Sequence, residues 1–353
     1  MRLLIDPRPP YLRWCRYGKA PGRGGRGIPG PEWIAAVRRG RPALARATSV
    51  SYRLHHGGAV IRDPVTRVDA ATLARLRGTV GLLSDQNEMV FEAMGALLAE
   101  LPAVPHLALC DTALFVDLPA EASAYAVPAE LRNRGVRRFG GSGLLHEWAW
   151  GRSVALADPA VRRVVSVELS DQPNVAALLD GRAMDTTIGF TAVEGIPSRT
   201  GCGDIDASVV FELRSSGLSL PEINELLSER SGFRALVGRS CTLRQMLAGG
   251  EGSGHALARR ILRYDLVRTI GAFTAVLGGV EVIAFTHEGA PEYAEFIREI
   301  CTDLEFLGVR PSGPGSSADD EIVSAEGNVK VVGLRADRWR IMAARAAAFE
   351  EEV

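Results

Sequence analysis

Short apolar runs that alternate with longer amphipathic segments most limit what this chain can fold into. The runs at His106–Cys110, Val161–Leu169, Val280–Phe285 and Val329–Leu334 have the length of buried strands. Between the second and third of these runs, Ala256–Leu277 spaces its apolar residues as on one face of a helix. This alternation predicts a layered α/β protein.

The remaining expected elements follow from local signals. Ser219, with Glu222 three residues later, has the capping-box pattern that begins a helix. The run SYRLHHGG (Ser51–Gly58) is typical of a strand running into a Gly-Gly turn. A further strand is expected at Val175–Leu179, paired with Val161–Leu169, and further helices at Asp69–Leu76, Asn87–Leu101, Pro128–Asn133, Ser219–Arg230, Glu292–Leu307 and Trp339–Glu350.

The beginning of the chain differs from the rest in composition. Met1–Gly30 is rich in Pro, Gly and Arg, which predicts a surface loop or loose arm rather than regular elements, and Glu32–Arg46 could form one helix. Residues 1–50 carry eleven Arg or Lys against two acidic residues, so their charge is +9 in a chain whose net charge is −1. The chain has only two lysines, so the arginines reflect a composition bias, and nucleic-acid binding is not expected.

Length and composition bound the class of protein. The 353 residues, 46% hydrophobic and 24% charged, suit a globular protein of two domains. No apolar run reaches the ~18 residues that would span a membrane, and the first residues do not resemble a secretory signal, so we expect a cytoplasmic protein. The five cysteines are scattered without metal-ligand spacing and are expected to be small core residues.

Seven segments in one order carry a specific resemblance. They are Tyr52–Gly58, Cys110–Phe115, Tyr125–Gly140, Asp185–Asp206, Gly217–Gly232, Ile270–Thr286 and Phe296–Val309. In that order and at those spacings they resemble the acetate kinase family, which includes propionate and butyrate kinases. The similarity covers about residues 50–345.

The resemblance implies an α/β protein with the two-lobed sugar-kinase and actin-like (ribonuclease H-like) fold. Residues 1–49 would be a divergent basic segment, 50–150 the rest of the N-terminal lobe with the carboxylate-side residues, and 151–353 the nucleotide lobe and dimerisation region. Family members bind ATP and a short carboxylate between the lobes, require magnesium, and are homodimers.

The residues that the resemblance keeps lie mainly on the carboxylate side. Arg53 matches the family's substrate arginine, and Asp111 matches its catalytic aspartate. His146 matches the outer histidine of the motif Phe-His-Gly-Thr-Ser-His and is assigned to substrate binding. Two structural interpretations stay open: one is that Arg53 and Asp111 only pair with each other, and the other is that His146 is a half-buried structural histidine.

On the nucleotide side the matches are fewer. Gly201 aligns with the family's catalytic arginine, and Arg199, two positions earlier, is the candidate to reach the cleft in its place. Arg244 lies where the family has an adenine-stacking arginine. Gly189 and Thr191, in the fourth matched segment, are assigned with it to cofactor binding.

Three nucleotide loops and the metal side depart from the family. At the first loop the family's N-terminal strand can survive as Arg2–Ile5, but a proline cluster replaces the Gly/Ser turn, and proline has no N–H to donate to phosphate. The second loop, His-Leu-Gly-Asn-Gly, aligns with Glu168–Gln172, which brings two carboxylates where phosphate would lie. The adenosine loop aligns with His287–Glu292. Arg338 aligns with the metal-side glutamate, and Ser142 aligns with the active-site histidine. The segment Gly141–Gly143 falls short of a full Gly-x-Ser-x-Gly nucleophile motif.

The sequence therefore predicts an ATP-dependent phosphotransferase for a small carboxylate, with weak or lost acetate kinase activity. ATP and magnesium are implied by resemblance, and no metal ligand is identified among the residues. One alternative is a non-catalytic homologue that acts as a scaffold or regulator. Another is a different reaction in the same cleft, with Glu168 or Asp171 as a general acid or base.

Overall fold

The computed structural model describes residues 1–8, 11–17, 21–27, 47–58, 60–78, 85–249, 252–310, 321–324 and 327–352. The chain divides into two compact units, described here in turn. Unit 1 comprises Met1–Val116, Gly141–Leu144 and Asp337–Val353, and unit 2 comprises Asp117–Gly140 and Leu145–Ala336. Each unit holds one six-stranded sheet with helices, so the predicted α/β class is confirmed.

Unit 1 contains a sheet with strand order β3-β2-β1-β4-β6-β5. Its strands are β1 (Arg2–Arg8), β2 (Tyr11–Tyr17), β3 (Pro21–Gly27), β4 (Ser49–Leu54), β5 (Val65–Arg67) and β6 (His106–Cys110). Its helices are α3 (Ala70–Arg77), α4 (Asp85–Glu100), the short 3-10 helix η2 (Asp111–Phe115) and α14 (Arg338–Glu352). Strands β1, β4 and β6 are parallel, and the other pairings are antiparallel.

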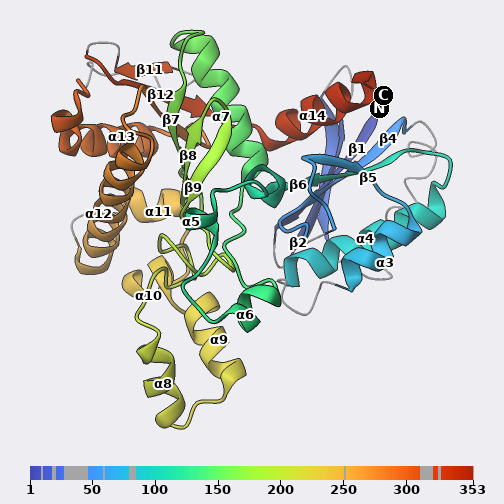
Figure 1. Cartoon of the computed structure of the whole chain (residues 1–353), viewed down its shortest axis with the longest axis horizontal. Coiled ribbons are helices and arrows are strands. Elements are labelled where there is room, and N and C mark those ends of the chain that lie inside the picture. The colour runs from blue at the N-terminus through green and yellow to red at the C-terminus, as the bar shows by residue number, and fades with distance from the viewer. Residues whose placement is uncertain are drawn as a thin grey trace. The chain divides into compact units, whose positions relative to one another are not determined.

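The two faces of the unit 1 sheet bury alternate residues. Leu3 and Ile5 of β1 pack in the core formed with α3 and α4, whereas Leu4 packs with α14 residues such as Met342. In Figure 1, α3 and α4 cover one face of this sheet and α14 lies over the other. The last helix is also tied to the first strand by an ion pair of 2.8 Å between Arg2 and Glu350.

The expectation of a loop or loose arm over residues 1–30 was wrong, because this segment supplies three strands of the sheet, the first of which contains the strand expected at Arg2–Ile5. Leu3, Ile5 and Leu12 of the paired strands β1 and β2 are buried in the core formed with α3 and α4. Pro7 is tolerated in β1 because the pairing with β4 stops at Ile5. The Gly-rich β3 is an edge strand, where proline and glycine interrupt the fewest contacts. The predicted helix over residues 32–46 lies outside the described residues.

Unit 2 contains a second sheet with strand order β11-β12-β10-β7-β8-β9. Its strands are β7 (Arg163–Glu168), β8 (Asn174–Leu179), β9 (Arg182–Thr186), β10 (Val282–His287), β11 (Glu321–Ser324) and β12 (Lys330–Arg335). The antiparallel pairing of β7 with β8 confirms the predicted strand pair. Strand β10 lies parallel to both β7 and β12.

Helices complete the second unit. They are α5 (Ala120–Ser123), α6 (Ala129–Asn133), α7 (Gly143–Leu156), α8 (Ser208–Ser215), α9 (Leu220–Glu229), α10 (Gly232–Val237), α11 (Leu243–Leu247), α12 (Ser253–Val276), α13 (Pro291–Asp303) and the 3-10 helix η3 (Glu305–Leu307). The first two residues of α7 belong to unit 1. The capping box of Ser219 and Glu222 forms at the start of α9, as predicted.

The apolar face of α12 forms the core of unit 2. Leu262, Leu266 and Ile270 pack against alternate residues of β7, β8 and β10 and against α13. Figure 1 shows α7 on the opposite side of this sheet from α12. No helix in the described parts of the chain combines the length and the apolar character that crossing a lipid bilayer requires.

Close packing against the backbone of η2 explains why the segment Gly141–Gly143 has a glycine at its last position. A Cβ atom on Gly143 would lie 2.1 Å from the backbone oxygen of Asp111 and 2.9 Å from Cβ of Leu114. The preceding Ser142 has a positive φ of 55°, which brings the start of α7 against η2. Gly143 thus fixes the position of the backbone that carries Asp111.

We expect the substitution Gly143→Ala to destabilise the protein, because backbone atoms would have to move to admit the new methyl group. Overpacking of this kind typically costs about 1–3 kcal/mol of unfolding free energy. Gly151 in the same helix is the matched control, since a Cβ there meets nothing within 4 Å among the described residues. Gly151→Ala should be neutral or stabilising by up to ~1 kcal/mol through helix propensity. Denaturant unfolding of both variants measures the difference, and equal effects would contradict the packing argument.

Candidate functional site

Charged side chains gather at the carboxyl-end edge of the parallel strands of unit 1. Asp6 comes from β1, Arg53 from β4, and Asp111 directly follows β6. The register pairs Ile5 with Tyr52, so Asp6 and Arg53 are neighbours on the face that also packs α14. In open α/β sheets this edge is where ligands bind, so these residues form the candidate acceptor site.

Arg53 holds the centre of this site. Its Nη1 donates to Oδ1 of Asp6 at 3.1 Å, and its Nη2 contacts Oδ2 of Asp111 at 2.6 Å. The exposed fractions are 4% for Arg53, 2% for Asp6 and 0% for Asp111. The structure therefore brings the predicted residues Arg53 and Asp111 together and adds Asp6, which the sequence analysis did not assign to the site.

The Gly-Gly turn after β4 supplies a histidine to the same site. Nδ1 of His55 lies 3.4 Å from Oδ2 of Asp111. The turn is held by Asn87 of α4, whose Oδ1 accepts from the His55 backbone N–H at 3.2 Å and whose Nδ2 donates to the His56 carbonyl at 2.8 Å. Asn87 is fully buried, and both ends of its amide bond to the turn; the sequence carries no local signal for this contact, which only the packing of α4 against β4 creates.

The charges of this site at neutral pH follow from its surroundings. Burial alone would raise the pKa of Asp111, but Arg53 and His55 outweigh it and hold that pKa well below its usual range. Burial and the Arg53 charge lower the pKa of His55. Burial raises the pKa of Cys110 to about 11, so this thiol stays protonated and is a poor nucleophile. Asp111 is therefore ionised beside a neutral His55.

His146 lies in unit 2, in a fully buried polar chain rather than at a half-buried position. Its Nδ1 contacts Oγ of Ser166 at 2.8 Å and its Nε2 contacts Oδ1 of Asn174 at 2.6 Å. Nδ2 of Asn174 donates to Glu168 at 2.8 Å and to the Gln172 carbonyl at 3.1 Å. The Asn174 oxygen must therefore face the histidine, which assigns the ring proton to Nε2.

This polar chain uses both ring nitrogens of His146 and an oxygen of Glu168 inside unit 2. Such contacts are typical of a structural histidine that joins α7 to β7 and β8. Glu168 is 2% exposed and accepts a hydrogen bond from Asn174, and it lies on the face of the sheet opposite to Val165 and Val167, which pack in the core with α12.

Asp171 has a structural contact of its own. Its Oδ1 accepts the backbone N–H of Leu243 at 2.8 Å, at the first residue of α11. Its carbonyl accepts the backbone N–H of Arg199 at 2.8 Å, and its Oδ2 lies 3.8 Å from Nε of that arginine. Arg199 is thus held beside Asp171, and the Gly201 N–H donates to Ser198 Oγ at 2.8 Å in the turn that follows.

The predicted cofactor residues of unit 2 lie in separate local contacts. Arg244 of α11 forms an ion pair of 3.3 Å with Glu292 of α13. A Cβ on Gly189 would collide with the carboxylate of Glu194, to which the Tyr125 hydroxyl also donates. Thr191 Oγ1 accepts a backbone N–H from two residues later, at 3.3 Å. The close approach at Gly189 thus serves local packing with Tyr125 and Glu194.

The loop after β10 is held by contacts within unit 2. The Gly289 N–H in the loop after β10 donates to Nδ1 of His287 at 3.0 Å, and the side chain of Arg335 packs where a Gly289 Cβ would lie. Within the described ranges, His, Cys, Asp and Glu side chains do not gather in groups of three or more that could hold a metal ion.

Comparisons with known proteins agree on one family. The model of the Acetokinase family matches residues 37–343. The chain is 30% identical to an acetate kinase of Bacteroides thetaiotaomicron over 311 residues, which cover 85% of this chain and 78% of that one. It is 35% identical to an acetate kinase of Rhodopseudomonas palustris over 293 residues, covering 79% and 73% of the two chains.

Solved structures show the fold. The acetate kinase of Porphyromonas gingivalis superposes with a TM-score of 0.86 at 23% identity, over 98% of both chains. A propionate kinase from Francisella tularensis gives a TM-score of 0.86 at 18% identity, over 97% of both chains. The predicted two-lobed, actin-like α/β fold is therefore confirmed.

The histidine turn beside this site makes stability depend on pH. Burial lowers the pKa of His56 to about 4, against about 6.5 in an unfolded chain. Between these values the unfolded state binds more protons, so the stability present above pH ~6.5 falls by up to ~1.4 kcal/mol per pH unit on acidification. His56→Asn retains an acceptor for the Gly58 N–H and should remove this part of the slope. Denaturant unfolding from pH 4.5 to 8 measures both slopes; the proteins should differ below pH 6.5 and run parallel above it.

Proposed function

The chain belongs to the acetokinase family, and from this premise we propose that it is an ATP-dependent phosphotransferase for a small acid or related acceptor, with acetate turnover far below that of an intact acetate kinase. The observation that carries the proposal is the buried Arg53–Asp111 ion pair at the ligand-binding edge of unit 1. Both residues match the family's acceptor-side arginine and aspartate.

The acceptor side supports binding in a preorganised site. Asp111 is ionised and fixed by Arg53, and the close approach of Gly143 sets the backbone that carries it. Groups held in one arrangement before the ligand arrives stabilise a transition state without reorganisation. These contacts favour a retained acceptor site over a decayed one.

The phosphoryl-donor side supports slow transfer. Gly201 and Ser142 stand at the family's catalytic arginine and histidine positions, and Arg338 at its metal-side glutamate. Loss of a single electrostatic contact to the transferring group typically costs ~10²–10³ in rate. Such losses are not additive, so we expect a fall of at least ~10³ relative to an intact family member.

A second candidate function is a ligand-binding scaffold or regulator without turnover. The observation that favours it is the internal use of loop donors in unit 2. Asp171 accepts the Leu243 N–H, and His287 accepts the Gly289 N–H, so two backbone donors are already bonded within the chain. A different reaction with Glu168 or Asp171 as acid or base is not supported, since both carboxylates make structural contacts.

We predict that a hydroxamate assay with acetate and Mg-ATP will stay near background for the wild-type protein. The physical reason is the loss of the three charge-stabilising positions described above. A residual rate, if measured with a sensitive coupled assay, should fall further in Arg53→Lys, because lysine cannot bridge two carboxylates as the guanidinium does. Turnover of several acetate molecules per second would contradict the reduced-activity proposal.

Direct titration with Mg-ATP separates the two candidate functions. A slow phosphotransferase should give saturable heat at millimolar Mg-ATP, and a scaffold that has lost the nucleotide should give none. Asp171→Asn tests the effect of charge alone. Its amide oxygen can still accept the Leu243 N–H, so the structural contact is kept while one negative charge is removed. Tighter Mg-ATP binding by this variant would identify Asp171 as a source of phosphate repulsion.

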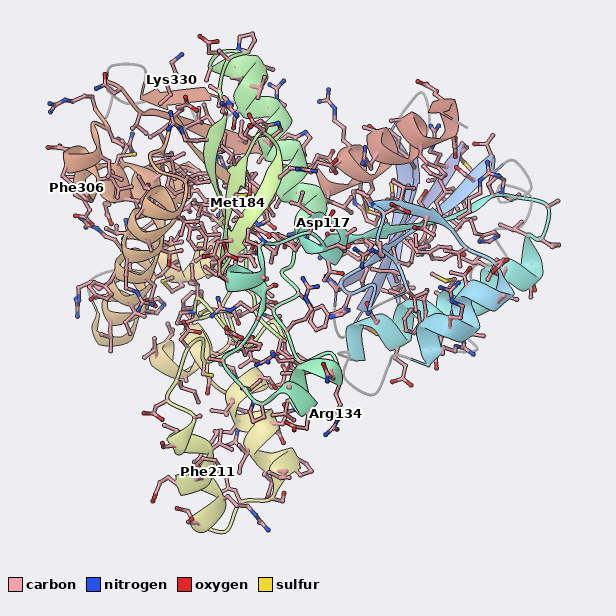
Figure 2. The ribbon with its side chains drawn as sticks, viewed as in Figure 1. Asp117, Arg134, Met184, Phe211, Phe306 and Lys330 are labelled. Carbon is pink, nitrogen blue, oxygen red and sulfur yellow. The ribbon has the colours of Figure 1, made fainter. Side chains whose placement is uncertain are left out.

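We also propose that the protein is a homodimer, joined through unit 2. Large apolar side chains are exposed on this unit, among them Phe211 of α8, which is 70% exposed, and Phe306 of η3, which is 73% exposed; both are labelled in Figure 2. Tyr264 of α12 is 70% exposed as well. Burial of such residues against a second copy would remove apolar surface from water. Light scattering at micromolar concentration should give twice the 37.8 kDa chain mass, and a clean monomer would refute the proposal.

A further inference from the structure

The guanidinium of Arg53 is shared between two carboxylates of its own chain. Nη1 contacts Asp6 and Nη2 contacts Asp111, and all three side chains are at least nine-tenths buried. Asp6 is brought there by β1, just before the proline-rich stretch that begins at Pro7. The protein itself therefore provides a carboxylate, that of Asp6, as a partner for Arg53 at this edge of the sheet.

A carboxylate ligand binds arginine best through two parallel N–H donors. At Arg53 both terminal nitrogens are already in contact with protein carboxylates. To bind Arg53, a short carboxylate would have to displace Asp6 from the guanidinium. Otherwise it would have to bind next to the carboxylates of both Asp6 and Asp111. Like charges brought together in a buried site cost several kcal/mol, which corresponds to well over a tenfold loss of affinity.

One carboxylate oxygen of the same cluster accepts no hydrogen bond from the described residues. Oδ1 of Asp111 is buried and has no hydrogen-bond donor among the residues that the structure describes, while its Oδ2 contacts Arg53 and His55. Buried carboxylate oxygens are normally hydrogen-bonded. The group that this site lacks is a donor, and an additional anion would not provide one.

We propose that Asp6 is a specificity-determining residue of the acceptor site. It is a resident carboxylate that occupies Arg53, excludes short anionic carboxylates, and favours an uncharged ligand that presents N–H donors to Asp111. This inference rests on the proposed function only in placing the acceptor at Arg53. The simplest ligand of this chemistry is a primary amide, which has the shape of a carboxylate without its charge.

Acetate and acetamide are a matched pair of probes for this inference. Each is titrated, labelled with ¹³C and without nucleotide, into wild-type protein and into Asp6→Asn, and binding is followed by NMR. Wild-type protein should bind acetamide at least about tenfold more tightly than acetate. In Asp6→Asn the acetate dissociation constant should fall at least about tenfold, whereas the acetamide constant should change less than about threefold.

Two controls keep the result interpretable. Asp6→Asn retains a side-chain oxygen for Arg53 Nη1, and its melting temperature reports whether the site still folds. Asp63→Asn makes the same charge change at an exposed position of unit 1 and should leave both dissociation constants unchanged. If the Asp6 variant does not fold, the acetamide preference of the wild-type protein alone decides the question.

Several outcomes would overturn the inference. Equal or tighter binding of acetate than acetamide by the wild-type protein is one. A second is that neither acetate nor acetamide binds to the wild-type protein or to Asp6→Asn. A third is that Asp6→Asn has the same affinity for acetate as the wild-type protein. The probe titration contains no nucleotide, and the Mg-ATP titration described above contains no acceptor. Each proposal can therefore fail while the other holds.

Discussion

The pair of buried ion contacts made by Arg53 is the interaction on which the rest of unit 1 depends. Removing a buried charge partner leaves an uncompensated charge and costs several kcal/mol, so Asp6, Arg53 and Asp111 stabilise one another only as a set. They join the ends of three strands, β1, β4 and β6, at one edge of the sheet. The position of Asp111 depends in turn on the close approach of Gly143, so packing and charge fix the same backbone.

Unit 2 shows a different use of polar groups. There, the carboxylates of Asp171 and Glu168 accept hydrogen bonds from their own unit, Asp171 from the backbone at the start of α11 and Glu168 from Asn174. Loops of this kind keep their shape without a phosphate. Unit 1 thus has a charged cluster with an unbonded Asp111 oxygen at its sheet edge, whereas the Asp171 and Glu168 carboxylates of unit 2 accept hydrogen bonds within their own unit.

Much of this architecture could be predicted from the sequence, and the exceptions have physical causes. The α12 helix, the β7–β8 pair and the Ser219 cap were predicted because their signals are local. The first strand was expected only over Arg2–Ile5, and β2 and β3 were missed, because their stability comes from pairing across the sheet, which outweighs an unfavourable Pro, Gly and Arg composition. Arg53 and Asp111 were identified by family likeness, whereas Asp6 was missed because only strand register brings it to Arg53.

Helix α14, the last helix of the chain, packs in unit 1, and this affects the order in which the two units can fold during synthesis. The first strand and the last helix belong to one unit, and Arg2 is ion-paired with Glu350. All of unit 2 is contained between them in the sequence. During synthesis the sheet of unit 1 therefore waits, with its α14 face uncovered, until residue 352 has left the ribosome, while unit 2 already has its whole chain. Folding of the cluster around Arg53 is then a late, non-local event, and we expect a chain cut short before α14 to lose this cluster although its residues lie near the beginning of the sequence.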